Sequence, residues 1–147
     1  VYKRQDQDGE RMAYANSIWV LMDTKKGIPV RVTKEISDAY GLEPQLPMQC
    51  SERKIMLPEK YEEKDSLVVP SYFIDTNHHM NNSRYVQAAM EYVPKEFRTT
   101  EVRVEYKKAA MCKDVIVPHV TIEDPRVTVA LCAPDGQPYA VVVFLKA

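Results

Sequence analysis

The chain has 147 residues, 45% of them hydrophobic, and a formal net charge of −1 at neutral pH. This is enough apolar material for a folded core and excludes an intrinsically disordered chain. The near-zero charge gives no electrostatic basis for binding nucleic acid or an anionic membrane. No apolar run approaches the roughly 20 residues of a membrane-spanning helix, and no secretory signal peptide is visible.

The three cysteines, Cys50, Cys112 and Cys132, are an odd number without CxxC spacing. They are typical of reduced thiols in a cytosolic protein rather than of a disulfide framework or a zinc site. We therefore expect a cytoplasmic protein.

The first five residues, Val-Tyr-Lys-Arg-Gln, look like the in-frame translation of a transposon-type sequencing adapter, and the chain has no initiator Met. We treat residues 1–5 as adapter-derived and exclude them from the fold prediction. On this hypothesis the chain is the back part of a longer protein.

The next stretch predicts two strands and a short helix. Residues 10–23 are apolar on both alternating faces, which favours a strand covered on both sides. A turn at residues 24–27 lets residues 28–32 pair back as a short strand. Thr33 is a candidate N-cap for a helix over residues 34–40.

Residues 42–58 carry three prolines and little periodicity, which is typical of a linker. The sequence therefore predicts a boundary here, between a first region over residues 6–41 and a second over residues 59–147.

The second region predicts one strand, one helix and four further strands. The helix is apolar around most of its circumference, which predicts burial on most sides. The four last strands, separated by turn residues, predict a meander. A sheet that curls around a buried helix is a hot-dog fold, in the α+β class. The expected strands are 66–72, 99–109, 115–122, 126–133 and 139–145, and the helix is 83–93.

A polar cluster directly precedes this helix. Asp75, Asn77 and His79 place a carboxylate, an amide and an imidazole on one short loop, and Asn81 and Asn82 suit a helix start. Such a cluster at the mouth of a buried helix predicts a functional site. The alternative interpretation is a turn and a helix cap, in which the Asp and Asn side chains satisfy local backbone groups.

The loop and the helix start resemble the D-x-N-x-H-x-N-N-x-x-Y signature of acyl-acyl-carrier-protein thioesterases. These are the plant plastid enzymes and their bacterial relatives, which are tandem hot-dog proteins. Residues 15–23 are similar to the closing strand of that family's first hot-dog, and the Glu-Tyr-Lys-Lys stretch at 105–108 is similar to a strand of its second. The positions that match the signature are Asp75, Asn77, His79, Asn81, Asn82 and Tyr85.

The resemblance implies a domain organisation. Residues 6–41 would be the C-terminal tail of a first hot-dog, 42–58 a linker, and 59–147 a complete second hot-dog. A second hot-dog on its own leaves its partner-facing sheet bare. We therefore expect the chain to homodimerise through its sheet.

The resemblance also implies an activity, the hydrolysis of fatty acyl-acyl carrier protein to free fatty acid, with acyl carrier protein as the partner. Asp75 would be base or nucleophile, Asn77 a positioning hydrogen-bonder, and His79 an acid–base or polarising group. The residues leave open which of Asp75 and His79 attacks or activates water. The supporting groups for substrate and oxyanion would be the helix-start amides with Asn81, Asn82 and Tyr85.

We expect neither a metal nor an organic cofactor. His78 and His79 are adjacent, but only His119 remains elsewhere in the chain and no acidic ligand set accompanies them. The site chemistry expected here is therefore that of side chains and water alone.

One position departs from the family. The plant enzymes carry a catalytic Glu soon after the stretch that matches residues 105–108, and Ala109 stands there in this chain. Either Asp75 and water suffice, or another acid substitutes, or the rate is low.

Arg103, Lys107, Lys108 and Lys113 could form a basic docking patch for the acidic carrier, although charges on a strand's outer face are commonly just solvated. Two other functions stay open. One is a hot-dog hydrolase of acyl-coenzyme A, and the other is a non-catalytic acyl-binding or structural hot-dog. Acyl chain length cannot be predicted from these residues.

Overall fold

The computed structural model describes residues 2–41, 52 and 54–147. The chain divides into two compact units, residues 1–50 and residues 51–147. The division falls inside the stretch predicted as a linker, most of which lies outside the described residues.

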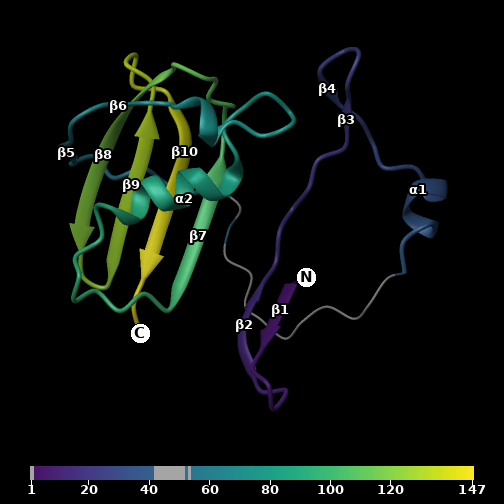
Figure 1. Ribbon diagram of the computed structural model, residues 1–147, viewed down its shortest axis with the longest axis horizontal. Helices are drawn as coiled ribbons and strands as arrows, with labels where there is room; N and C mark the ends of the chain where they lie inside the picture. Colours follow the sequence, from purple (N-terminus) through teal and green to yellow (C-terminus); the bar gives the residue numbers. More distant parts are fainter. Residues whose placement is uncertain (1, 42–51, 53) are drawn as a thin grey trace. The chain divides into compact units, whose positions relative to one another are not determined.

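The first unit consists of two small antiparallel pairs and a short helix (Figure 1). β1 (Tyr2–Gln5) pairs with β2 (Arg11–Ala15), and β3 (Met22–Asp23) pairs with β4 (Ile28–Pro29). β1 contains four of the five residues attributed to an adapter, so these residues take part in the ladder whatever their origin. The hairpin predicted around residues 24–27 is confirmed.

The helix α1 (Lys34–Asp38) is one short helix, as predicted, and ends two residues early. The Thr33 hydroxyl oxygen accepts a hydrogen bond from the Ile36 amide at 3.4 Å. This satisfies one of the amides that a helix start leaves without a partner, so Thr33 is the N-cap.

The prediction of one continuous strand over residues 10–23 is wrong for its middle part, residues 16–21. Only β2 and β3 have strand geometry, and every side chain of β2 is exposed. Residues 10–23 are apolar on both faces, but the described part of this unit supplies no second layer to cover them. Alternation alone therefore could not sustain one long strand.

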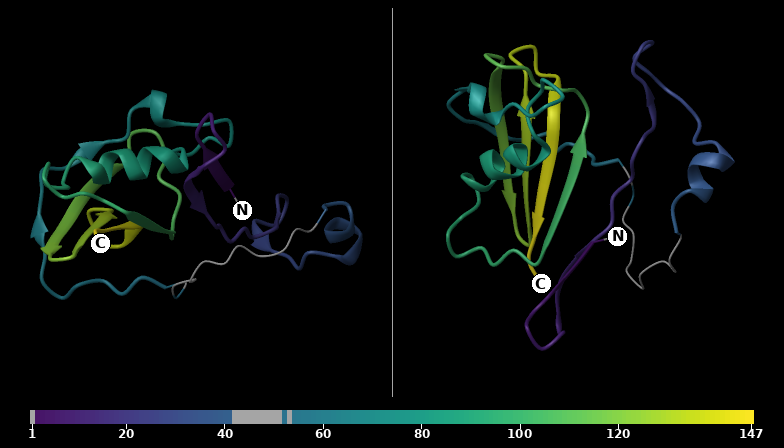
Figure 2. Two further views of the ribbon diagram at one scale, coloured as in Figure 1. Left: turned by 90° about the horizontal axis from the view of Figure 1, so that it is seen from below. Right: turned by 45° about the vertical axis from the view of Figure 1, so that its right-hand side comes forward.

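The second unit is an antiparallel sheet with one helix across one face (Figures 1 and 2). The strands, in chain order, are β5 (Glu62–Glu63), β6 (Leu67–Val68), β7 (Glu101–Tyr106), β8 (Val115–Glu123), β9 (Arg126–Cys132) and β10 (Pro138–Leu145). Their order across the sheet is β5-β8-β9-β10-β7, and β6 also pairs with β8. No helix in the described ranges is long and apolar enough to cross a bilayer.

The predicted four-strand meander is correct for β8, β9 and β10 and wrong for β7. β7 pairs with β10, with Val104 opposite Val142, and not with β8. The connection over residues 107–114 therefore crosses from one side of the sheet to the other. Strand alternation predicts which residues face the core, but it does not specify the neighbour of a strand.

Two further elements are shorter than predicted. Residues 66–72 hold only β6 and the first part of the 3-10 turn η1 (Ser71–Phe73), which directly follows Pro70. The helix α2 (Asn82–Met90) ends three residues before the predicted end. The tight turn at Pro70 brings the chain onto the loop that precedes α2.

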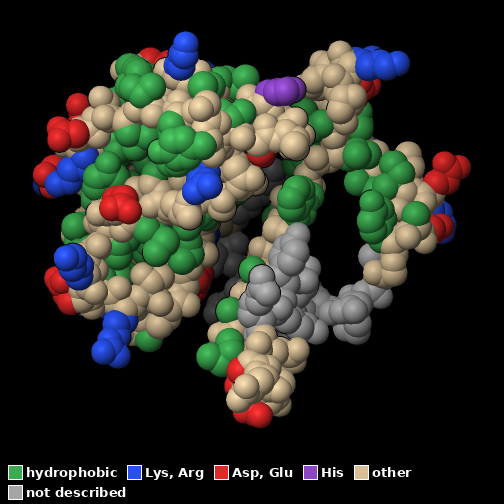
Figure 3. Space-filling view, viewed as in Figure 1, with side chains coloured by type: hydrophobic (Ala, Val, Ile, Leu, Met, Phe, Trp, Pro, Cys, Tyr) green, Lys and Arg blue, Asp and Glu red, His purple; other side chains and the backbone are tan. Residues whose placement is uncertain are grey.

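α2 is buried on one side only, so the prediction that it is buried on most sides is wrong. Tyr85 and Ala89 face the sheet and are 2% and 0% exposed, whereas Met90 is 56% exposed. Hydrophobic side chains reach the surface on this face of the molecule (Figure 3). The reason is that the sheet packs against the side of α2 that carries Tyr85 and Ala89 and leaves the side that carries Met90 uncovered.

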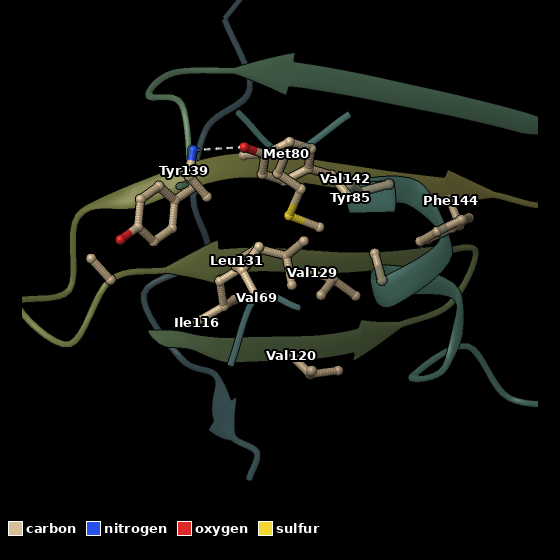
Figure 4. Close-up of a cluster of buried hydrophobic side chains, with 14 of the residues drawn as sticks. Val69, Met80, Tyr85, Ile116, Val120, Val129, Leu131, Tyr139, Val142 and Phe144 are labelled. Atoms are coloured by element: carbon tan, nitrogen blue, oxygen red, sulfur yellow. Dashed lines mark hydrogen bonds between the residues drawn. The ribbon is translucent and has the colours of Figure 1, made fainter. Parts of the chain in front are cut away.

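The main core fills the space between α2 and the sheet (Figure 4). Burying a Val, Leu or Phe side chain contributes about 1.5–3 kcal/mol, so this layer dominates the stability of the unit. Its fully buried members include Val69, Met80, Ile116, Val127, Val129, Leu131, Val142 and Phe144.

A smaller cluster lies on the opposite face of the sheet, where Ile55 packs with Ala130, Cys132, Val141 and Val143. Burial raises the pKa of the Cys132 thiol to about 11. This thiol is therefore protonated at neutral pH and is a core residue, not a nucleophile.

Candidate active site

Residues 74–80 form a tight loop in front of α2. Ile74 pairs with Met80 in an isolated antiparallel bridge, and the Asp75 amide donates to the His79 carbonyl at 3.0 Å. His78, at the tip, has a left-handed φ of 64°, and its amide donates to the Asp75 carbonyl. The backbone therefore holds Asp75 and His79 side by side at the two ends of the loop.

The Asp75 carboxylate faces the His79 ring. Its Oδ1 lies 4.0 Å from His79 Nδ1 and accepts a 2.8 Å hydrogen bond from the Asn77 backbone amide. A separation of 4.0 Å is too long for a hydrogen bond but close enough for a small side-chain rotation to form one. The Asn77 main chain thus holds the Asp75 carboxylate. The Asn77 side chain makes no hydrogen bond to the described residues.

The asparagine pair begins α2, as predicted. Asn81 is the N-cap, and its Oδ1 accepts from the Ser83 amide at 3.0 Å and from the Ser83 hydroxyl at 2.7 Å. Asn82 is the first helical residue, and its carbonyl accepts from the Tyr106 hydroxyl at 3.0 Å. The Asn81 side chain is therefore occupied by the cap.

Tyr85 points from α2 towards the end of the sheet (Figure 4). Its hydroxyl oxygen accepts from the buried Ala110 amide at 2.9 Å, and the Ala110 carbonyl accepts from the Met80 amide at 2.8 Å. Burial raises the pKa of Tyr85, while the Ala110 hydrogen bond acts in the opposite direction. The Tyr85 hydroxyl stays protonated at neutral pH and keeps its own proton to donate.

A surface hollow brings the loop, α2 and the end of β7 together. Of the residues predicted as catalytic, His79 lines it, whereas Asp75 and Asn77 lie outside the lining. Of the predicted support residues, Asn82 and Tyr85 line it and Asn81 does not. The lining residues are His79, Met80, Asn82, Tyr85, Tyr106, Lys107, Lys108 and Ala109.

Two sequence profiles match the chain. The profile of the acyl-ACP thioesterase C-terminal domain matches residues 57–130, and that of the acyl-ACP thioesterase N-terminal domain matches residues 1–40. The chain belongs to the acyl-ACP thioesterase family. The two domains match in the order that the sequence predicted.

Solved structures of thioesterases share this fold. An acyl-ACP thioesterase from Bacteroides thetaiotaomicron superposes with a TM-score of 0.81 at 18% identity, over 99% of this chain and 64% of that one. A putative oleoyl thioesterase from Lactobacillus plantarum superposes with a TM-score of 0.73 at 22% identity, over 95% of this chain and 59% of that one. A 12:0-ACP thioesterase from Umbellularia californica superposes with a TM-score of 0.67 at 15% identity, over 84% of this chain and 51% of that one.

These likenesses confirm the hot-dog fold. The chain spans 64% and 59% of the length of the two bacterial thioesterases. A comparison with curated proteins finds no match.

The position where the acyl-ACP thioesterase resemblance expects a carboxylate lies inside the hollow. Ala109 lines it together with His79, so this site has a methyl group where the plant enzymes have a Glu. The nearby carboxylate of Asp114 is engaged elsewhere, because its Oδ2 accepts from the Met111 amide at 2.9 Å and the Tyr139 hydroxyl at 3.2 Å. No lining residue of the hollow is acidic.

The four predicted docking cations differ in their contacts. Lys107 pairs with Glu105 at 2.9 Å, and Arg103 donates to the Glu52 carbonyl at 2.6 Å. Lys108 lies over the Tyr139 ring at 5.6 Å, and the exposed Lys113 has a left-handed φ of 73°. Lys108 and Lys113 are therefore the two members whose charged groups have neither an ion pair nor a hydrogen bond among the described residues.

Sequence reasoning missed Tyr106, which joins β7 to α2. Its position in the Glu-Tyr-Lys-Lys stretch was the available signal, but the resemblance gave that Tyr no role. Among the described residues, no group of three or more His, Cys, Asp or Glu side chains is arranged to hold a metal ion.

Proposed function

We propose that this protein hydrolyses the thioester of fatty acyl-acyl carrier protein and releases free fatty acid in the cytoplasm. The observation that carries the proposal is the His79 imidazole at the wall of the hollow, with the Asp75 carboxylate oxygen 4.0 Å from its Nδ1. Membership of the acyl-ACP thioesterase family supports the substrate class. The similar protein from Umbellularia californica is named for a 12:0-ACP substrate.

The geometry favours His79 as the general base. A hydrogen bond from His79 Nδ1–H to Asp75 would leave Nε2 free to take a proton from water. The resulting hydroxide attacks the thioester carbonyl carbon and forms a tetrahedral oxyanion. The carbon–sulfur bond then breaks, and the leaving thiolate takes the proton from the His79 imidazolium.

The oxyanion would be held by donors around the hollow. The Tyr85 hydroxyl accepts from the Ala110 amide through its oxygen, so its own proton is not used in that bond and is free to be donated. The start of α2 carries the positive end of the helix dipole, which adds to this stabilisation. Asn77 contributes through its backbone amide, which fixes the Asp75 carboxylate.

The carrier protein would dock beside the hollow. Lys107 is neutralised by Glu105 and Arg103 is tied to the Glu52 carbonyl, so we assign the attraction of an acidic carrier to Lys108 and Lys113. An acyl-coenzyme A substrate is the alternative within this chemistry. Turnover of acyl-coenzyme A and acyl-carrier protein with the same acyl chain distinguishes the two.

The test is release of free fatty acid from medium- and long-chain acyl-carrier protein, with the 147-residue chain and with a chain extended upstream. We expect Asp75→Asn and His79→Gln each to lower kcat by about 10²-fold or more. His78→Asn is the matched control, because His78 is the neighbouring imidazole outside the hollow lining and Asn tolerates its left-handed φ.

Activity of His79→Gln equal to wild type would place the base elsewhere. A folded wild-type protein without turnover of either substrate would favour the non-catalytic acyl-binding or structural hot-dog. Ala109 is the observation that keeps this second function in view, because it leaves the hollow without an acidic side chain.

A further inference from the structure

Tyr106 links the edge strand β7 to the start of α2. Its hydroxyl donates to the Asn82 carbonyl at 3.0 Å, and its ring lies edge-on to the Tyr85 ring, with centroids 5.7 Å apart at 71°. Asn82 is the first residue of the helix, three positions after His79. A carbonyl oxygen has two lone pairs, so this bond adds to the helix ladder without replacing a bond in it.

A second link joins the same two parts of the structure a few residues later. The Ala110 amide donates to the Tyr85 hydroxyl, and the Ala110 carbonyl accepts from the Met80 amide, which follows His79. Ala109, in the hollow wall, lies between Tyr106 and Ala110 in the chain. Residues 107–109, which form one wall of the hollow, are therefore flanked in the chain by two residues, Tyr106 and Ala110, that are bonded to the His79 loop or to α2.

The two links differ in how firmly the rest of the structure supports them. Ala110 is 0% exposed and has both of its backbone groups bonded, so the core holds it. Tyr106 is 44% exposed at the rim, and β7 is bonded to β10 on one side. The hydrogen bond from the Tyr106 hydroxyl to the Asn82 carbonyl therefore ties the end of β7 to the start of α2.

We propose that Tyr106 is a positioning residue, whose hydroxyl sets the distance between the His79 loop and the wall of the hollow over residues 107–109. This inference rests on the proposed thioester hydrolysis. Reaction rates depend steeply on such distances, because a displacement of about 1 Å can cost about 10²-fold. Partial burial, with a smaller effect of Tyr85, raises the pKa of Tyr106, so its hydroxyl is protonated and can donate at neutral pH.

The variant that tests this is Tyr106→Phe, which removes the hydroxyl and keeps the ring. The matched control is Tyr139→Phe, which removes another tyrosine hydroxyl, one that donates to Asp114 and not to α2. The first measurement is amide hydrogen exchange of residues 79–86 in the 147-residue chain. We expect exchange in this segment to rise in Tyr106→Phe and to stay at the wild-type level in Tyr139→Phe.

The second measurement is hydrolysis of acyl-carrier protein by the same variants. We expect Tyr106→Phe to lower kcat about tenfold with KM changed by less than about twofold, and Tyr139→Phe to keep the wild-type kcat. Unchanged exchange in Tyr106→Phe, or an unchanged kcat in an active protein, would overturn the assignment. A wild-type protein without turnover refutes the proposed hydrolysis, and the exchange comparison still decides whether Tyr106 holds the helix start.

Discussion

At the scale of single residues, Ala109 is the position that limits the proposed chemistry. It is exposed within the hollow that His79 lines, so a longer side chain there meets solvent rather than packed core. The described hollow offers one imidazole and no carboxylate to activate water. General bases contribute about 10²–10⁴-fold each, so the missing group is worth a large factor in rate.

We therefore expect Ala109→Glu to raise kcat for acyl-carrier protein at least about tenfold. The change supplies a carboxylate on the wall that faces His79. Ala109→Gln is the matched control, since it adds the same length without the charge and should leave kcat near the wild-type value. Equal rates in both variants and the wild type, measured as free-acid release, would show that the hollow does not lack a base.

Much of this loop could be predicted from the sequence, because its chemistry is local. The Asn81 cap depends on residues a few positions apart, and so do the bonds that Asp75 makes within its own turn. The Tyr85–Ala110 and Tyr106–Asn82 bonds could not be predicted. Each joins residues distant in the chain, and only the packing of α2 on the sheet brings them together.

At the scale of elements, β7 holds the Ile55 segment over the outer face of the sheet. The Ile55 amide donates to Glu105 Oε2 at 2.9 Å, and Lys107 pairs with the same carboxylate. Burial acts to raise the pKa of Glu105, but the hydrogen bonds from Ile55 and Lys107 outweigh it, and the pKa lies below its usual value. The ionised carboxylate is thus the form that fastens the segment.

Because the pKa of Glu105 is lowered in the folded state, the direction in which its contribution to the free energy of unfolding changes with pH is fixed. The stabilisation by Glu105 is present above the unfolded pKa of about 4.3 and is lost as the pH falls through the folded pKa. We expect Glu105→Gln to lower the free energy of unfolding by about 1 kcal/mol at pH 7, and this deficit to shrink below pH 4. Urea unfolding of the wild type and Glu105→Gln at pH 7 and at pH 3 measures this difference in the free energy of unfolding.

The control is Glu101→Gln, which neutralises an exposed carboxylate on the same strand and should change little. A Glu105→Gln deficit that is the same at pH 7 and pH 3 would mean that the carboxylate charge does not fasten the Ile55 segment.

The elements that the sequence predicted well are those whose pattern is reinforced by their immediate neighbours. β8, β9 and β10 follow one another through short turns, so alternation and turn residues suffice. The place of β7 beside β10 could not be predicted, because its pattern fits any edge of the sheet. The exposed side of α2 could not be predicted either, since an apolar helix surface does not reveal how far a sheet reaches around it.

At the scale of the whole molecule, the second unit leaves one side of β7 without a partner strand among the described residues. Val102 and Tyr106 on this strand are 45% and 44% exposed. Unpaired edge strands with exposed apolar side chains favour association with another sheet.

We therefore propose that the 147-residue chain forms a homodimer through this sheet, as the resemblance led us to expect. Multi-angle light scattering across a range of concentrations measures the assembly. Val102→Glu should shift it towards the monomer, whereas Ile122→Glu, an exposed residue of β8, should not. A wild-type protein that is monomeric at every concentration would contradict this assembly.

The pairing of β7 with β10 also has a consequence for biosynthesis. A nascent chain emerges from its N-terminal side, so β7 leaves the ribosome before β8 and β9, yet its partner emerges after both. Until β10 is released, β7 cannot join the sheet, and Tyr106 cannot reach its place beside α2. Distant pairings form slowly because a long loop must close first. We expect the hollow that His79 lines to be the last part of this unit to form, and a ribosome stalled within β10 to display β8 and β9 paired with each other but without β7.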